Sequence, residues 1–177
     1  MSITTKRGDG GETSLLSGAR VKKSCARIEA LGAVDEANAF LGVARSKSRG
    51  YAEKCIRSFQ EGLSKVMAEL ADDAATLSEE KFVGEPSVAA LEEIVSRCES
   101  AVGPLKAFVV PGDTPLSADL HAARAVIRRA ERRVTALTDE GIVVRPELLR
   151  YVNRLSDAVF SLARLSAEGP KNNVVPL

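Results

Sequence analysis

The sequence predicts an all-α protein, a five-helix bundle preceded by a glycine-rich N-terminal loop. Apolar residues recur every three or four positions over five long stretches, glycine or proline separates these stretches, and strand-like alternation is almost absent. Short connections between amphipathic helices favour antiparallel packing of consecutive helices. We expect one domain of 177 residues, with the loop over residues 1–24, the bundle over 25–168 and a loose tail over 169–177.

The first two helices have different apolar faces. The stretch from about Ala26 to Gly50 places small residues on its core side, which favours close packing: Ala30, Ala33, Ala37 and Ala44, widened by Leu31, Val34 and Leu41. The stretch from Tyr51 to about Ala75 has larger core residues: Cys55, Phe59, Leu63, Val66 and Leu70.

A proline marks the start of each remaining helix, at the position where its missing N–H is tolerated. Pro86 opens a helix to about Ala101, and Pro146 opens the last one, to Ala167. Pro115 opens the fourth helix, which Asp113 or Thr114 is expected to cap and which ends near Gly141. A short extended piece and a turn, residues 108–115, lead into it.

The fourth helix carries five arginines between residues 120 and 133. His121, Arg124, Arg128 and Glu131 form one stripe beside its apolar face, and Arg132 lies one turn beyond Arg128. Guanidinium groups bind phosphate oxygens in pairs, and Glu131 can orient an arginine or bind hydrated Mg²⁺. The alternative is a surface helix with weak Arg–Glu pairs, which is our interpretation of Arg129 and Arg133. His121 is interpreted as structural.

The N-terminal segment has a composition suited to a polyphosphate. Gly8, Gly10 and Gly11 lie among Thr, Ser and Lys residues, and Arg20, Lys22 and Lys23 follow. Glycines let successive backbone N–H groups point at one anion, and the hydroxyl and ammonium groups add donors. The segment lacks the Walker pattern GxxxxGK[ST] and a preceding strand. The alternative is a polar N-terminus without defined structure.

Four polar residues lie close to apolar seams: Asp35, Asn38, Asn153 and Asp157. A buried, unpaired carboxylate is costly, so Asp35 needs a cation, and the arginine stripe offers one. Asn153 either contacts a ligand or forms a hydrogen bond between helices.

Composition narrows the classes of function. The formal net charge is +1, so no global field attracts nucleic acid or a membrane surface. No apolar run matches a secretory signal or a membrane helix. Three cysteines without CxxC spacing and one histidine indicate neither a disulfide framework nor a zinc site. We expect a cytoplasmic protein that binds neither nucleic acid nor membranes.

Six motifs in this order resemble the PduO-type ATP:cob(I)alamin adenosyltransferases. They occupy residues 7–15, 20–23, 29–38, 108–112, 123–132 and 151–157, and they span nearly the whole chain. The resemblance implies a five-helix bundle that forms a homotrimer with active sites between subunits. Such enzymes transfer the 5′-deoxyadenosyl group of ATP, with Mg²⁺, to cob(I)alamin and release triphosphate. It also implies two partners, a reductase and an adenosylcobalamin-dependent enzyme.

The resemblance assigns roles by position. ATP is expected to contact Thr5, Lys6, Arg7, Gly8, Thr13, Ser14 and Lys23 of the N-terminal segment, Arg128, Glu131 and Arg132 of the fourth helix, and Asn153 of the last helix. The expected catalytic residues are Arg124, Arg128 and Asp35, with Arg124 and Asp35 paired across subunits. Phe108 is expected to face the corrin. No protein cluster is expected to bind metal directly; Mg²⁺ accompanies ATP near Glu131.

Among the departures from the family pattern, two bear on the function. Arg7 stands where threonine is common, and Asp113 where a second glycine is common. They favour an alternative function, a non-catalytic protein of the same fold that binds or delivers ATP or corrinoid. A nucleic-acid-binding bundle using residues 124–133 is a further alternative, which the small net charge and the lack of an aromatic stacking surface disfavour.

Overall fold

The described part of the chain forms five helices and a small hairpin. The computed structural model describes residues 4, 6–73, 77–78, 82–105 and 108–167. The elements in chain order are β1 (Glu12–Ser14), β2 (Arg20–Lys22), α1 (Ala26–Lys47), α2 (Gly50–Ala71), α3 (Glu85–Val102), α4 (Pro115–Asp139) and α5 (Pro146–Ala167). The predicted five-helix bundle is therefore confirmed. Within the described ranges, no helix is long and apolar enough to cross a membrane.

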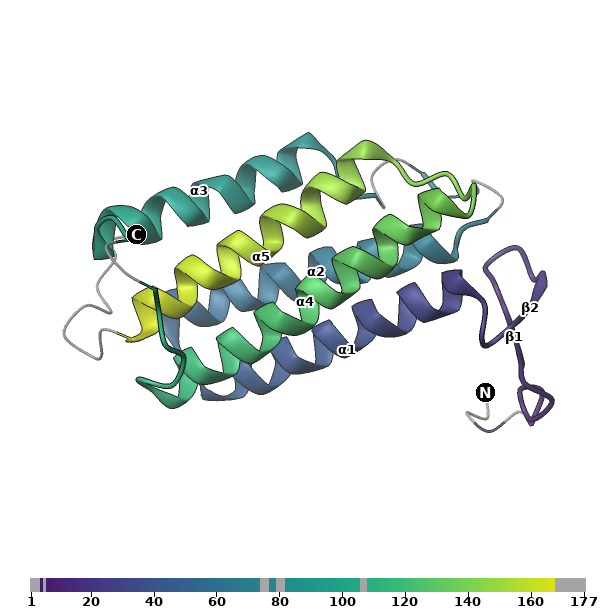
Figure 1. The fold of residues 1–177 in the computed structure, drawn as a ribbon, viewed down its shortest axis with the longest axis horizontal. Helices are drawn as coiled ribbons and strands as arrows, with labels where there is room; N and C mark the ends of the chain where they lie inside the picture. The colour runs from purple at the N-terminus through teal and green to yellow at the C-terminus, as the bar shows by residue number, and fades with distance from the viewer. Residues whose placement is uncertain (1–3, 5, 74–76, 79–81, 106–107, 168–177) are drawn as a thin grey trace.

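The helices alternate in direction along the chain, so that consecutive helices run antiparallel (Figure 1). The pairs α1–α4, α4–α5, α3–α5 and α1–α2 make the main contacts. α3 and α5 lie side by side (Figure 1). They run parallel because one helix, α4, comes between them in the chain and direction alternates from helix to helix. The alanines of α1 are buried as expected, which lets α1 and α4 approach closely.

The predicted cap of α4 is confirmed. Thr114 is the cap: its Oγ1 accepts a hydrogen bond from the Ser117 backbone N–H at 3.1 Å. The same hydroxyl donates to the Ser166 carbonyl at 3.0 Å. One side chain thus starts α4 and ties that start to the end of α5.

Two boundaries differ from the expectation. The second helix ends at Ala71 rather than near residue 75, because the Asp72 backbone leaves the helical region and its carboxylate accepts a hydrogen bond from the Leu77 N–H at 2.9 Å. The N-terminal segment, expected to be a loop, contains an antiparallel pair in which Thr13 lies opposite Val21. Strands of three residues are too short to show a periodic pattern.

The hairpin is fastened to the end of α2. The Leu16 N–H donates to the Ala71 carbonyl at 3.0 Å, and the Ser17 hydroxyl donates to the Asp73 carboxylate at 2.9 Å. Leu15 is buried. These contacts place the hairpin at the end of the bundle where α1 begins (Figure 1).

Candidate functional site

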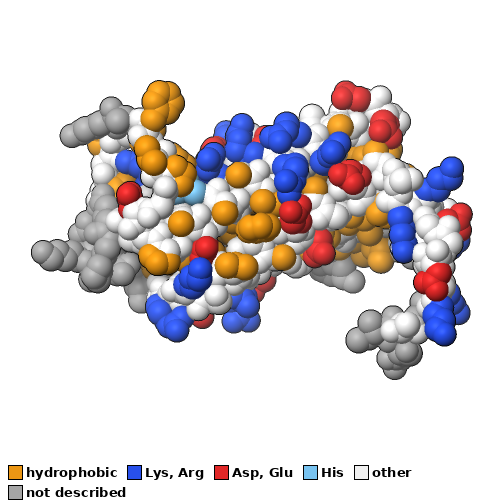
Figure 2. All heavy atoms as spheres, turned by 60° about the horizontal axis from the view of Figure 1, so that its bottom comes forward, with side chains coloured by type: hydrophobic (Ala, Val, Ile, Leu, Met, Phe, Trp, Pro, Cys, Tyr) orange, Lys and Arg blue, Asp and Glu red, His pale blue; other side chains and the backbone are white. Residues whose placement is uncertain are grey.

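A shallow cavity of about 250 Å³ lies on α4, beside the arginine stripe. Its lining combines two guanidinium groups, two carboxylates and a hydroxyl: Arg128, Arg132, Glu131, Asp139 and Thr135, together with Ala136. The guanidinium of Arg132 donates to the Arg128 carbonyl at 3.0 Å, which holds it along the helix. Figure 2 shows basic side chains gathered beside an apolar strip on this side of the molecule. The cavity can hold a polyanion together with its cation.

Glu131 is held from α5. The side-chain amide of Asn153 donates from Nδ2 to Glu131 Oε1 at 2.8 Å. Asn153 Oδ1 in turn accepts a hydrogen bond from Arg154 at 3.3 Å. Within the chain, Asn153 therefore makes the hydrogen bond between helices that was its alternative interpretation, and its contact with nucleotide stays a prediction.

Arg124 lies outside this cavity, one turn towards the start of α4. Its guanidinium lies 5.7 Å above the ring of Phe160 on α5, a cation–π contact. Its Nε is buried and has no hydrogen-bond partner within the described residues. A buried N–H of this kind needs an acceptor, so Arg124 can donate a hydrogen bond to a group from outside the described chain.

His121 packs beside Arg124 as a structural residue. Its side chain is 5% exposed, and its ring meets the edge of Phe160 at 5.8 Å and 65°. Burial lowers the pKa of His121 below 6.5, and the charge of Arg124 lowers it further, while Asp113 opposes the shift. The imidazole is therefore neutral at pH 7, which agrees with the structural interpretation.

Asp35 lies exposed on α1. In the part of the chain that the structure describes, no ion pair joins it to Arg124. The expected pair spans two subunits, so a single chain leaves it a prediction.

The two arginines assigned to the surface do form pairs with α1. Arg129 bonds to Glu36, and Arg133 lies 3.4 Å from Glu29. All four side chains are about half exposed. Solvent screens such pairs, so their contribution to stability is small. The interpretation of Arg129 and Arg133 as surface ion pairs is confirmed.

The hairpin brings most of the N-terminal candidates together. Arg20 donates to the Arg7 carbonyl at 2.9 Å and to the Ser14 hydroxyl at 3.3 Å. The Lys23 N–H donates to the Gly11 carbonyl at 2.8 Å. A Cβ built on Gly8 would lie 3.0 Å from Lys23 Nζ, so the ammonium covers the glycine backbone directly. Arg20 organises this group, a role that its sequence position alone did not indicate.

The remaining N-terminal candidates are Lys6, Thr13 and Thr5. Lys6 is exposed and adopts a left-handed backbone conformation, with φ 58°. Thr13 is half-buried in β1. Thr5 lies outside the described residues.

The two halves of the expected phosphate site are apart within one chain. The hairpin lies at the end of the bundle where α1 begins (Figure 1), and none of the residues that line the α4 cavity comes from the hairpin. The structure therefore assembles each half separately and does not join them.

Phe108 stands fully exposed in the connection before α4, with a relative accessibility of 102%. Val110, two residues on, is 79% exposed. Two apolar side chains in water on a short loop are typical of a surface that receives an apolar partner or ligand. This location suits a residue that faces a large planar ligand, and that role stays a prediction.

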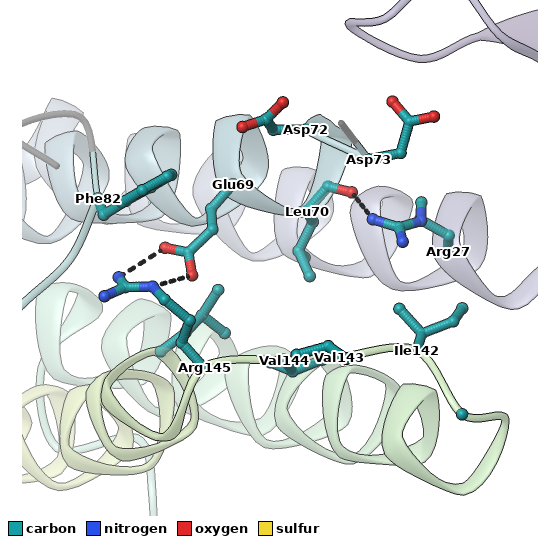
Figure 3. Close-up of a pocket in the computed structure, with 12 residues that line it drawn as sticks. Arg27, Glu69, Leu70, Asp72, Asp73, Phe82, Ile142, Val143, Val144 and Arg145 are labelled. Atoms are coloured by element: carbon teal, nitrogen blue, oxygen red, sulfur yellow. Dashed lines mark hydrogen bonds and ion pairs between the residues drawn. The ribbon is translucent and has the colours of Figure 1, made fainter. Parts of the chain in front are cut away.

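A larger cavity, of about 520 Å³, lies between the end of α2 and the connection from α4 to α5 (Figure 3). Each of its five charged residues already has a protein partner. Arg145 pairs with Glu69, Arg27 donates to the Leu70 carbonyl at 2.7 Å, and Asp72 and Asp73 accept hydrogen bonds from Leu77 and Ser17. Since its charged groups have partners within the chain, we assign this cavity no role in the candidate site.

The donor set on α4 fits Mg²⁺ only as a companion of phosphate. Among the described residues, no three His, Cys, Asp or Glu side chains are grouped to hold a metal ion. Glu131 and Asp139 both line the α4 cavity. Since these two residues are eight positions apart on one helix, about 12 Å, they cannot hold one ion together. Mg²⁺ is commonly bound by one carboxylate with water and phosphate oxygens completing its shell, and Glu131 fits that role.

These features define a class of protein, a helical bundle with a cluster of arginine and glutamate side chains on one helix. The family model described as Cobalamin adenosyltransferase matches residues 3–166, and the chain belongs to this family.

Curated relatives agree along the chain. A Corrinoid adenosyltransferase of Citrobacter freundii is 41% identical over 170 residues, covering 95% of this chain and 96% of the relative. The Corrinoid adenosyltransferase PduO of Salmonella typhimurium is 39% identical over 166 residues, covering 93% of this chain. The chain spans about half the length of that second relative, with 49% covered.

Solved structures agree in fold. A variant PduO-type ATP:corrinoid adenosyltransferase from Lactobacillus reuteri, complexed with cobalamin and ATP, superposes with a TM-score of 0.86 and 31% identity. The match covers 94% of each chain. Another variant of the Lactobacillus reuteri protein, complexed with ATP, gives a TM-score of 0.85 and 32% identity, again over 94% of each chain.

Proposed function

We propose that this protein transfers the 5′-deoxyadenosyl group of ATP to the cobalt of cob(I)alamin, forming adenosylcobalamin and triphosphate. The observation that carries the proposal is the α4 cavity, where Arg128 and Arg132 meet Glu131 on one helix. Family membership and the similar structures holding cobalamin and ATP support the choice of substrates.

The protein itself forms no covalent bond in this reaction. Cobalt(I) attacks C5′ of ATP with its electron pair, the Co–C bond forms, the C5′–O bond breaks, and its electrons leave with triphosphate. The protein must align C5′ with cobalt and stabilise the charge that develops on the leaving group. Arg128 and Arg132, which line the α4 cavity, would bind those phosphate oxygens. Glu131 would hold Mg²⁺ that accompanies the phosphates, and the ion would neutralise further charge on the leaving group.

We propose that the active site forms between subunits of a homotrimer. Three observations support this: the hairpin and the α4 cavity are apart in one chain, Arg124 Nε lacks an acceptor, and Asp35 is exposed. Exposed apolar side chains on α1, Phe40 and Val43, add surface for subunit contact. In this arrangement the hairpin group, with Thr5, Lys6, Arg7, Gly8, Thr13, Ser14 and Lys23, covers the nucleotide, Asn153 contacts it, and Asp35 pairs with Arg124 of a neighbour.

The oligomer has its own test. Light scattering after gel filtration should give three times the monomer mass of 18.8 kDa. The reversal Asp35→Arg should weaken turnover, and combining it with Arg124→Asp should restore part of the loss, because the pair is reformed with opposite charges. A monomer with full activity would contradict the shared site.

We propose that Phe108 faces the corrin and that the enzyme works with two partners in the cytoplasm. The exposure of Phe108 leaves its ring available for a flat apolar ligand. Cob(I)alamin must be supplied by a reductase, and the product must be taken up by an adenosylcobalamin-dependent enzyme. A reducing compartment suits both the cobalt(I) substrate and three cysteines without disulfides.

The test of the reaction uses ATP, Mg²⁺ and chemically reduced cobalamin, with the corrinoid absorbance and triphosphate followed together. Equal amounts of adenosylcobalamin and triphosphate are expected. Tight binding of both substrates without turnover would instead favour a carrier of ATP or corrinoid. Arg7 and Asp113, which depart from the family pattern, are the features that support this second function.

A further inference from the structure

We propose that Arg154, a residue outside the α4 cavity, positions Glu131 through the side-chain amide of Asn153. The three residues form a continuous hydrogen-bonded chain, which we call the Arg154–Asn153–Glu131 relay. Arg154 is therefore a positioning residue for the site that binds ATP and Mg²⁺, and this inference rests on the proposed function.

The orientation of the Asn153 amide follows from the chemistry of its two neighbours. An arginine can only donate, and an ionised glutamate can only accept. Arg154 Nη1 lies 3.3 Å from Asn153 Oδ1, and Asn153 Nδ2 lies 2.8 Å from Glu131 Oε1. Turning the amide over would set donor against donor and acceptor against acceptor. Arg154 and Glu131 therefore favour the same orientation, in which Nδ2 faces Glu131, and Arg154 holds the other end of the amide.

The relay keeps Glu131 away from the phosphate-binding arginines. Arg128 and Glu131 are three residues apart on one helix face, a spacing at which an ion pair commonly forms. Among the described residues, however, no ion pair joins Glu131 to Arg128 or to Arg132. Glu131 is turned towards α5 by Asn153 instead. Neither guanidinium group is therefore paired with Glu131, and both are available to bind phosphate. One oxygen of the Glu131 carboxylate stays available for a cation.

Arg154 is itself held in place from α3 and α5. Its Nε lies 3.0 Å from Glu92 Oε1, and its Nη1 lies 3.6 Å from Asp157 Oδ2. These side chains are about half exposed, so the pairs add little to stability. Removing Arg154 should therefore change how Glu131 is oriented without unfolding the bundle.

Arg150 offers a matched control. It lies on α5 one turn before Arg154, is similarly exposed, and also pairs with α3, through Glu85. Its other partner is Glu147, and it has no contact with Asn153 among the hydrogen bonds of the described residues. Arg150→Ala removes the same kind of interhelical pair without touching the relay.

The experiment compares wild type, Arg154→Ala, Arg154→Lys, Asn153→Ala, the double variant Arg154→Ala/Asn153→Ala, and Arg150→Ala. Arg154→Ala should raise the KM for ATP and the Mg²⁺ concentration needed for half activity by about 3- to 10-fold, the size expected for the loss of one ordinary hydrogen bond. The KM for cobalamin should not change. Lysine can still donate to Asn153, so Arg154→Lys should recover most of the loss. Since Arg154 acts through Asn153, the double variant should match Asn153→Ala alone.

Calorimetric titration of each variant with ATP and Mg²⁺ separates this inference from the proposed function. Wild-type binding without turnover would reject the transferase but leave the affinities of the variants to test the relay. Arg154→Ala affinity equal to that of Arg150→Ala, or losses that add in the double variant, would overturn the relay. Every variant should have a midpoint temperature of thermal unfolding within a few degrees of wild type. If Arg154→Ala loses affinity only because it unfolds, the positioning role is wrong.

Discussion

Arg145 and Glu69 form a two-pronged ion pair, with Nε to Oε1 at 2.7 Å and Nη2 to Oε2 at 3.0 Å (Figure 3). The same guanidinium donates to the Val83 carbonyl at 2.7 Å and lies 4.7 Å from the centre of the Phe82 ring. One side chain thus connects α2, the segment before α3 and the start of α5. The Glu69 side chain is only 10% exposed, so it depends on this partner.

Arg145→Ala should therefore destabilise the protein strongly. It leaves a nearly buried carboxylate and the Val83 carbonyl without their donor, at a cost of about 3 kcal/mol, the lower end for breaking a buried pair because Arg145 is partly exposed. Denaturant unfolding measures the loss. Arg57→Ala removes an exposed pair with Glu61 and should cost under about 0.5 kcal/mol. Equal losses of unfolding free energy in the two variants would show that the Arg145–Glu69 pair does not stabilise the fold.

Gly62→Ala should also destabilise the fold, by about 1–3 kcal/mol, through overpacking. A Cβ at this position in α2 would lie 1.7 Å from the Tyr151 hydroxyl oxygen and 2.4 Å from its ring carbon Cζ. Tyr151 is buried on α5 and has little room to move. Gly42→Ala is the matched control, since its Cβ meets only the flexible end of Gln60 at 3.4 Å. The control should be neutral or more stable, because alanine favours helix.

Arg128→Ala should abolish most turnover while leaving the bundle folded. The loss of one preorganised donor to the leaving phosphates is expected to lower kcat by about 10²- to 10³-fold. Arg133→Ala, on the same helix but paired with Glu29, should retain near wild-type rates. Circular dichroism checks the fold, and the corrinoid absorbance assay gives the rate. Near-normal activity of Arg128→Ala would remove the assigned role.

The lowered pKa of His121 predicts how the stability of the fold depends on pH. Its pKa is lowered in the folded protein by burial and by Arg124, so the unfolded chain binds more protons. The contribution of the neutral imidazole is fully present above about pH 6.5 and is lost as the pH falls from there through the folded pKa. His121→Asn should flatten the curve of unfolding free energy against pH in this range. An unchanged slope in the variant would assign the pH dependence to other groups.

Several features of the fold could be predicted because they are encoded locally. Helical periodicity and proline positions located five helices, and the short polar side chain of Thr114 marked the start of α4. The arginines on the surface could be separated from Arg128 by their angular position on the helix, and their pairs with α1 agree. The hairpin could not, because β1 and β2 are stabilised by pairing and by the contact of Leu16 with Ala71 rather than by a pattern of their own.

The sequence by itself determined which residues share a helix face, and so placed Arg128, Glu131 and Arg132 together as an anion-binding group. Periodicity is a property of one segment, and it carries no information on what approaches from another helix. Only the tertiary structure decided that Asn153 faces Glu131, that Arg154 donates to that amide, and that the hairpin does not line the α4 cavity. These relationships depend on the packing of α4, α5 and α3 against one another, where a shift of a few ångströms makes or breaks a hydrogen bond.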